Sequence, residues 1–112
     1  MTRHDDRIRF QHMLDLAKEA VEMIAGKSRG DLKYERILEH ALVRVVEIIG
    51  EAAARVSQET QQEYPQIPWQ EIIGMRNQLI HGYDSIDANI LWDTIEIDLP
   101  SLISLLEKIL NE

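Results

Sequence analysis

The residues of this sequence that could do chemistry lie together in one segment, residues 76–84, which reads RNQLIHGYD. Arg76, Asn77, His81 and Tyr83 fall within eight residues there. An arginine stays charged and can bind a phosphate through two N–H donors at once. A histidine titrates near neutral pH and can move a proton. Because RNA carries its own nucleophile, the 2′-hydroxyl, these residue types favour RNA cleavage that needs no metal.

The spacing of Arg76 and His81 restricts how they could act together. They are five residues apart, which is about 140° around an ideal helix, so they cannot share one face of a straight helix. Asn77 and His81, four apart, can do so. Arg76 could still converge with His81 if the helix ends near Ile80, or if a second copy of the segment faces the first across a two-fold axis. The spacing therefore predicts that His81 lies at a helix terminus or at a subunit interface.

Each of these residues also has a structural interpretation. His81 could be a helix-end residue that interacts with the helix dipole. Arg76 could form a salt bridge, for example with Glu51, and could still act on a phosphate while Glu51 orients it. Tyr83 could be a half-buried anchor.

The elements that must position this segment are helical, because apolar residues recur at intervals of three and four almost throughout. Asp31 and Asp87 are suited to cap helices, and Gly50 suggests close packing or a bend inside one. No strand-like alternation of useful length appears. We expect an all-α up-and-down bundle of four to five helices that forms a single domain over 1–112. The first expected segments are helices over about 5–25 and 31–56, followed by a turn or short helix in 57–67. A helix over 68–80, beginning at Pro68 and ending or unwinding by Gly82, and a helix over 87–98 come next. The last segment is 99–110, with a break or kink at Pro100.

Composition excludes several classes of protein and site. There is no cysteine, so disulfides, thiolate zinc sites and thiol catalysis are absent. His4, His12 and His40 do not have ligand spacing, so no metal site is expected. No run of about 18 apolar residues occurs, so no membrane association is expected. The charged start of the chain is unlike a signal peptide, which predicts a cytoplasmic protein.

The net charge of −8 is unevenly distributed. Residues 1–56 hold ten basic and ten acidic side chains, whereas residues 57–112 hold ten acidic side chains against only Arg76 and Lys108. A uniformly basic nucleic-acid binder is excluded. We interpret the pattern as RNA held in a dimer cleft walled by cations of the first half, with the acidic half facing solvent or a partner protein. The candidate wall residues are Arg3, Arg7, Arg9, Lys27, Arg29 and Lys33.

The segment also resembles a known family. Arg76, His81 and Tyr83 match the R-x4-H-x-Y signature of HepT-type HEPN-domain toxins. The resemblance extends to IIGEAAARVS at 48–57, to YPQIPWQEIIGMRNQLIHGYDSID at 64–87, and to Trp92 and the LPSL that follows Asp98. It therefore covers essentially the whole chain.

The resemblance implies a metal-independent ribonuclease toxin that forms a homodimer, with two R-x4-H motifs lining one cleft. It also implies a type VII-like toxin–antitoxin pair, in which an MNT-type nucleotidyltransferase antitoxin silences the toxin by AMPylation. Carried over by position, Arg76 and His81 would be catalytic, Asn77 would support them, and Tyr83 would carry the AMP. No cofactor is expected in this chain, because the partner antitoxin uses the ATP.

Two other functions compete with the ribonuclease. The chain could be a non-catalytic nucleotide- or substrate-binding subunit that partners a nucleotidyltransferase, or a scaffold that only forms a helical dimer. The Arg76 and His81 pair favours the enzyme, because neither a binding subunit nor a scaffold needs both residues.

Overall fold

The computed structural model describes residues 3–80 and 85–112 of the 112-residue chain. In those ranges the chain is helical, and its single β feature is an isolated antiparallel bridge between Ile80 and Ile86. The elements in chain order are α1 (Arg3–Met23), the 3₁₀ helix η1 (Arg29–Lys33), α2 (Arg36–Arg55), α3 (Gln58–Glu63), α4 (Trp69–Ile73), α5 (Met75–Leu79), α6 (Ala88–Asp93), the π-helical turn η2 (Thr94–Asp98) and α7 (Leu99–Leu110).

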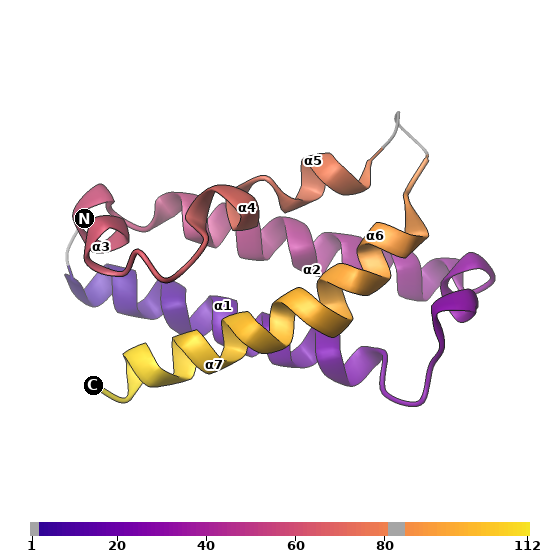
Figure 1. Ribbon diagram of the computed structural model, residues 1–112, viewed down its shortest axis with the longest axis horizontal. Coiled ribbons are helices and arrows are strands. Elements are labelled where there is room, and N and C mark those ends of the chain that lie inside the picture. The colour runs from indigo at the N-terminus through magenta and orange to yellow at the C-terminus, as the bar shows by residue number, and fades with distance from the viewer. Residues whose placement is uncertain (1–2, 81–84) are drawn as a thin grey trace.

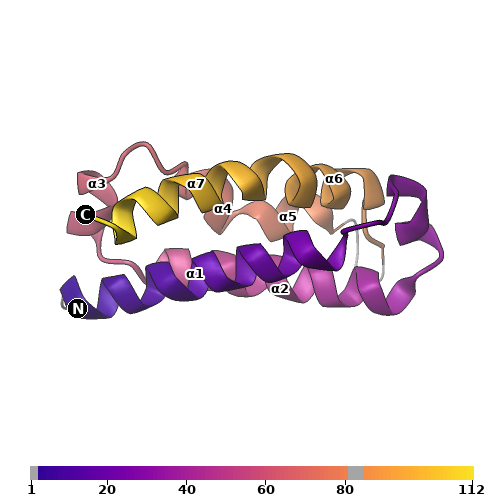
Figure 2. The same ribbon diagram turned by 90° about the horizontal axis from the view of Figure 1, so that it is seen from below.

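The helices run up and down along one long axis (Figures 1 and 2). α1 and α2 form an antiparallel pair, α3, α4 and α5 return along α2, and the α6–η2–α7 rod runs back so that the C-terminus lies at the same end as the start of α1. The expected all-α, HEPN-like up-and-down bundle is confirmed.

The core lies where α1, α2 and the α6–η2–α7 rod meet. Apolar side chains at helical spacing from each are fully buried there, and each contributes about 1.5–3 kcal/mol by leaving water. They include Met13 of α1, Leu42, Val46 and Ile49 of α2, and Leu91, Ile95 and Leu106 of the rod.

The region 31–56, expected as one helix capped by Asp31, is two helices. Asp31 lies inside η1, where its carboxylate accepts the backbone N–H of Ser28 at 2.8 Å. Leu32 is buried against the core, and α2 begins only at Arg36. The expected cap at Asp31 is therefore wrong, because Asp31 is the third helical residue of η1, Ser28 is the N-cap of η1, and Glu35 is the N-cap of α2.

The expected helix over 68–80 is also divided. Gly74 interrupts it with φ −92° and ψ 2°, and the N–H of Gly74 donates to the carbonyl of Gln70 at 3.0 Å. Pro68 is the residue before α4 and not its first helical residue. α5 ends at Leu79, while Gly82 lies outside the described residues.

The expected break in the helix at Pro100 does not occur, because α6, η2 and α7 follow one another without a gap. A proline lacks the N–H of an internal helical residue, and its ring clashes with the carbonyl four residues earlier. That residue is Glu96, and the backbone there widens into the π turn of Thr94–Asp98. The π turn thus lets the helix continue past the proline.

Three local predictions are confirmed. Asp87 caps α6 by accepting the N–H of Ile90 at 3.0 Å. Residues 57–67 contain a short helix, α3, which Ser57 caps. Gly50 marks a close approach, because a Cβ there would lie 3.1 Å from the carbonyl oxygen of Ile72 and 3.3 Å from that of Ile73.

No helix in the described residues is long and apolar enough to cross a membrane.

Candidate functional site

The site is built on α5, which is held against α2 by its own apolar side chains and by α4. Met75 and Leu79, four residues apart, are buried, so the same face of α5 points to the core. α4 approaches α2 closely at Gly50, where a Cβ would lie 3.1 Å from the carbonyl oxygen of Ile72. Arg76 and Asn77 lie on the exposed side of α5.

The side chain of Arg76 is fixed by a carboxylate of α2. Its Nε donates to Oε2 of Glu47 at 2.8 Å. The expected salt bridge between Arg76 and Glu51 is therefore wrong. Glu51 instead pairs with Arg44, with Oε1 of Glu51 3.7 Å from Nη1 of Arg44. Glu47 and Glu51 are one turn apart on α2, and α5 packs level with Glu47.

This hydrogen bond leaves most of the guanidinium available to a ligand. Arginine has five N–H donors, and in the described part of the chain Arg76 uses only its Nε–H in a hydrogen bond. The two terminal nitrogens keep the geometry that binds a phosphate through two parallel hydrogen bonds. Arg76 is about half exposed, with a side-chain exposure of 51%, so a ligand can reach it.

Asn77 is exposed beside Arg76. Its backbone N–H donates to the carbonyl of Gly74 at 3.0 Å, which fixes the start of α5. Its side-chain amide has no hydrogen-bond partner among the described residues, so it too can contact a ligand.

His81 and Tyr83 lie outside the described residues, but the structure describes the two chain ends that flank them. Ile80 has extended backbone, with φ −99° and ψ 119°, and pairs with Ile86. The N–H of Asp87 donates to the carbonyl of Leu79 at 2.8 Å. α5 therefore ends where the sequence required it to end for Arg76 and His81 to converge. Their convergence stays a prediction.

Metal ligands are not assembled in the part of the chain that the structure describes. No group of three His, Asp or Glu side chains there could hold a metal ion. His4, His12 and His40 are all exposed.

Comparison with known proteins identifies the family. The model of the family described as "Ribonuclease HepT-like" matches residues 13–109, which include all of the segment 76–84. This chain belongs to the Ribonuclease HepT-like family. The HepT-type resemblance noted in the sequence is therefore confirmed, and this HepT-like chain is a member of a ribonuclease family.

Several relatives match over nearly their full length. "Probable ribonuclease HepT" of Thermococcus cleftensis is 36% identical over 102 residues, covering 88% of this chain and 92% of the relative. "Putative RNase TTE0752" of Caldanaerobacter subterraneus is 35% identical over 103 residues, covering 92% of each. A third relative, "Gamma-glutamylcyclotransferase and putative RNase MJ0434" of Methanocaldococcus jannaschii, is 33% identical over 98% of this chain but only 50% of its own length. No solved structure matches the chain significantly.

Proposed function

We propose that this HepT-like chain is the metal-independent ribonuclease toxin of a type VII-like HEPN/MNT toxin–antitoxin pair, acting in the cytoplasm as a homodimer. The observation that carries the proposal is the orientation of Arg76. Glu47 holds the Nε side of the guanidinium, and neither terminal nitrogen forms a hydrogen bond with another residue in the described ranges 3–80 and 85–112.

In the proposed reaction Arg76 binds the scissile phosphate and stabilises the charge that develops on it. Asn77 adds a neutral donor beside it. His81 takes the proton from the 2′-hydroxyl as that oxygen attacks phosphorus, or gives a proton to the 5′-oxygen as the P–O bond breaks. In a homodimer two His81 side chains can divide these roles, one as base and one as acid. No metal or other cofactor enters the scheme.

Silencing is proposed to act on Tyr83. A nucleotidyltransferase antitoxin transfers AMP from ATP to the phenol oxygen, and pyrophosphate leaves. The product carries bulk and a phosphodiester charge two residues from His81. That charge would compete for Arg76 and repel the phosphates of RNA.

Induced expression tests the proposed enzyme. The chain alone should stop growth and cleave RNA, and cleavage should persist in a metal chelator. Arg76→Ala and His81→Ala should abolish both effects, while His40→Ala, which changes an exposed histidine on α2, should leave them intact. Toxicity that survives the first two substitutions would mean that the assigned site is wrong. RNA binding without cleavage would favour the binding subunit.

A further inference from the structure

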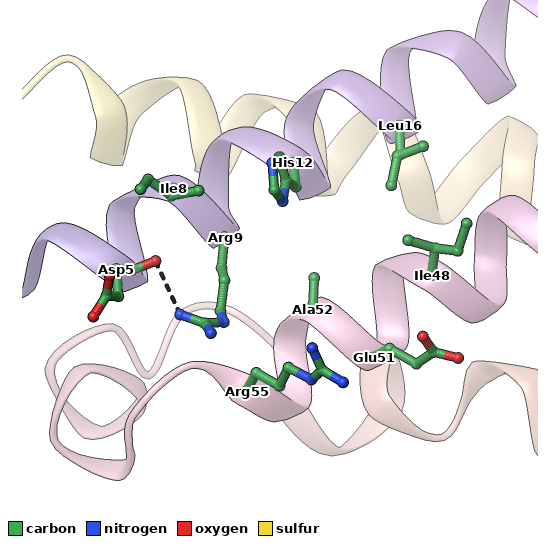
Figure 3. Close-up of a pocket in the computed structure, with 9 residues that line it drawn as sticks. All are labelled: Asp5, Ile8, Arg9, His12, Leu16, Ile48, Glu51, Ala52 and Arg55. Atoms are coloured by element: carbon green, nitrogen blue, oxygen red, sulfur yellow. Dashed lines mark hydrogen bonds between the residues drawn. The ribbon is translucent and has the colours of Figure 1, made fainter. Parts of the chain in front are cut away.

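A groove runs between α1 and α2 on the side of this helix pair shown in Figure 3. Three side chains able to donate hydrogen bonds to an anion enter it from two helices. Arg9 and His12 come from α1, and Arg55 comes from the last turn of α2. Figure 3 shows Arg9 and His12 directed toward α2, and the side chain of Arg55 extending along α2 below Ala52.

These donors are largely unused. Arg9 donates one N–H to the backbone carbonyl of Asp5 at 3.2 Å, which leaves its other donors available. Arg55 and His12 are exposed and form no hydrogen bond or ion pair with any other residue that the structure describes. The groove therefore presents donors from three side chains in a protein whose net charge is −8.

Several of the other basic residues that the sequence suggested as walls of an RNA cleft form ion pairs or hydrogen bonds outside this groove. Lys27 pairs with Glu35 at 2.9 Å, and Arg29 pairs with Asp93 at 2.7 Å. Arg7 donates to the carbonyl of Leu110 at 2.6 Å, which ties α1 to the end of α7. Of the six candidate wall residues, Arg9 is the one that lines this groove in the described part of the chain.

Two carboxylates also line the groove and limit its positive charge. The carboxylate of Glu51 lies 3.7 Å from Arg44, and Figure 3 shows it directed away from Arg55. The carboxylate of Asp5 lies at the far end, directed away from His12. Both are therefore placed away from the space between Arg9, His12 and Arg55.

The floor between these donors is apolar. It is formed by Ile8, Leu16, Ile48 and Ala52, and Ile8 keeps 42% of its surface exposed. A nucleotide combines an anionic phosphate with the apolar faces of its sugar and base. The groove offers a matching combination, whereas a free inorganic anion would use only the cations.

The groove also lies along the same helix as the proposed active site. Glu47, which holds Arg76, and Arg55 are eight residues apart on α2, about 12 Å along the helix axis. A single strand whose scissile phosphate lies at Arg76 can thus reach Arg55 with a phosphate a few nucleotides away.

We propose that Arg9, His12 and Arg55 form a phosphate-binding subsite for single-stranded RNA, outside the catalytic site. This inference rests on the proposed ribonuclease function and adds the path of the substrate. The subsite binds the strand and takes no part in breaking the bond.

The test compares RNA of two lengths. Arg9→Gln, Arg55→Gln and the double variant are made in the active chain, and cleavage of a dinucleotide and of a single-stranded RNA of about ten nucleotides is measured. Each single substitution should raise KM for the longer RNA about threefold to fivefold, as expected when one exposed ion pair with a phosphate is removed, with kcat unchanged. Dinucleotide cleavage should stay the same, because a dinucleotide cannot span both sites.

Binding provides a second readout that does not depend on turnover. Each phosphate of a single strand that a cation neutralises adds about 0.7 to the slope of log affinity against log salt. In a His81→Ala background, the double variant should therefore lower this slope by about 1.4. Arg36→Gln is the matched control, because it removes the same charge from an exposed position at the opposite end of α2. It should change neither KM nor the salt slope.

The outcomes separate the subsite from the function. If the double variant cleaves long RNA with unchanged KM and shows an unchanged salt slope, the proposed subsite is wrong. The proposed ribonuclease function is not affected by that result. A parent chain that neither binds nor cleaves RNA would overturn both. If the double variant instead loses self-association in sedimentation, with RNA affinity per dimer unchanged, the groove is a protein interface and the subsite is wrong.

Discussion

The Nε–H of Arg76 on α5 is bonded to Oε2 of Glu47 on α2 across 2.8 Å. The Glu47 side chain is 24% exposed, whereas that of Arg76 is 51% exposed. Glu47 is thus the better-fixed member of the pair, and it determines the direction in which the guanidinium points. A side chain that does not touch substrate can in this way control catalysis.

Replacing Glu47 should therefore reduce RNA cleavage without unfolding the protein. Glu47→Gln keeps a hydrogen-bond acceptor but removes the charge, and Glu47→Ala removes both. We expect kcat to fall about tenfold in the alanine variant and less in the glutamine variant, because a mispositioned arginine loses transition-state stabilisation. The free energy of unfolding should change by less than about 1 kcal/mol, because the pair is partly exposed.

Glu51→Ala is the control, because the sequence suggested Glu51, and not Glu47, as the residue that orients Arg76. Glu51 lies one turn further along α2 and lies near Arg44, so its removal should leave the orientation of Arg76 unchanged. A larger drop in kcat in Glu51→Ala than in Glu47→Ala would mean that Glu51 positions the arginine after all.

The sequence could not determine which of these two glutamates contacts Arg76. Glu47 and Glu51 are four residues apart and lie on the same side of α2, so periodicity could predict only that an acidic residue of this helix faces Arg76. The level at which α5 packs along α2 depends on the break at Gly74 and on the contact at Gly50. Those depend on tertiary packing, which the local pattern does not contain.

The features that the sequence predicted correctly are those that depend on local pattern and not on tertiary packing. Helices, the cap at Asp87 and the up-and-down order follow from local spacing and capping chemistry, and the structure has all of them. The continuous passage through Pro100 was missed, because a π turn can absorb the defect of a proline without ending a helix. His12 and Arg55 were missed as a pair, because only the packing of α1 on α2 brings them to one groove.

Gly50→Ala tests the contact that places α4 and α5. An alanine in a helix is favoured by about 1 kcal/mol over glycine, but its Cβ would lie 3.1 Å and 3.3 Å from two backbone carbonyl oxygens. Those oxygens belong to α4, whose Trp69 and Ile72 are buried and restrict its movement. Overpacking should dominate and lower the free energy of unfolding by about 1–3 kcal/mol in urea titrations.

Gly30→Ala is the matched control for this effect. A Cβ at Gly30 would meet only the Ser28 hydroxyl, at 4.0 Å, so its stability should be unchanged or slightly higher. If Gly50→Ala is as stable as the parent, α4 can move away from α2, and the close approach is not what fixes the site.

Asp6 predicts a pH dependence of stability. Its side chain is 1% exposed on α1 and accepts hydrogen bonds from the Ser57 N–H at 3.0 Å, the Ser57 hydroxyl at 2.7 Å and the Thr60 hydroxyl at 2.6 Å. Burial raises the pKa of Asp6, but the hydrogen bonds from Thr60 and Ser57 outweigh burial and hold the pKa below its usual value. The ionised form thus ties α1 to the start of α3.

Because the pKa of Asp6 is lower in the folded state than in the unfolded chain, its stabilisation is present above the unfolded pKa of about 4 and is lost as pH falls through the folded value. Asp6→Asn should lower the free energy of unfolding at pH 7 by about 1–3 kcal/mol, and the difference should shrink as pH falls below the unfolded pKa of about 4. Asp15→Asn, at an exposed position of the same helix, should show little effect at either pH. An Asp6→Asn penalty that is independent of pH would show that the charge contributes nothing.

The proposed silencing of the toxin predicts that one tyrosine is modified out of three. The hydroxyl of Tyr64 donates to Oε2 of Glu112 at 2.8 Å, and this hydrogen bond with burial raises the pKa of Tyr64 to about 12. The phenolate form of Tyr64 is therefore disfavoured, and its hydroxyl is already bonded within the fold. Tyr34 is 86% exposed, so exposure alone would favour it. Tyr83 lies two residues after His81, where an added phosphodiester would affect the reaction directly.

Tyr83→Phe should therefore keep RNA cleavage and lose silencing, since it removes only the oxygen that would accept AMP. With the nucleotidyltransferase and ATP, the parent and Tyr34→Phe should gain the mass of one or more AMP units and lose cleavage. Tyr83→Phe should gain none and stay toxic when both proteins are expressed. An adduct that peptide mass spectrometry maps to Tyr34 would show that the antitoxin selects its target by exposure and not by the neighbourhood of the catalytic residues.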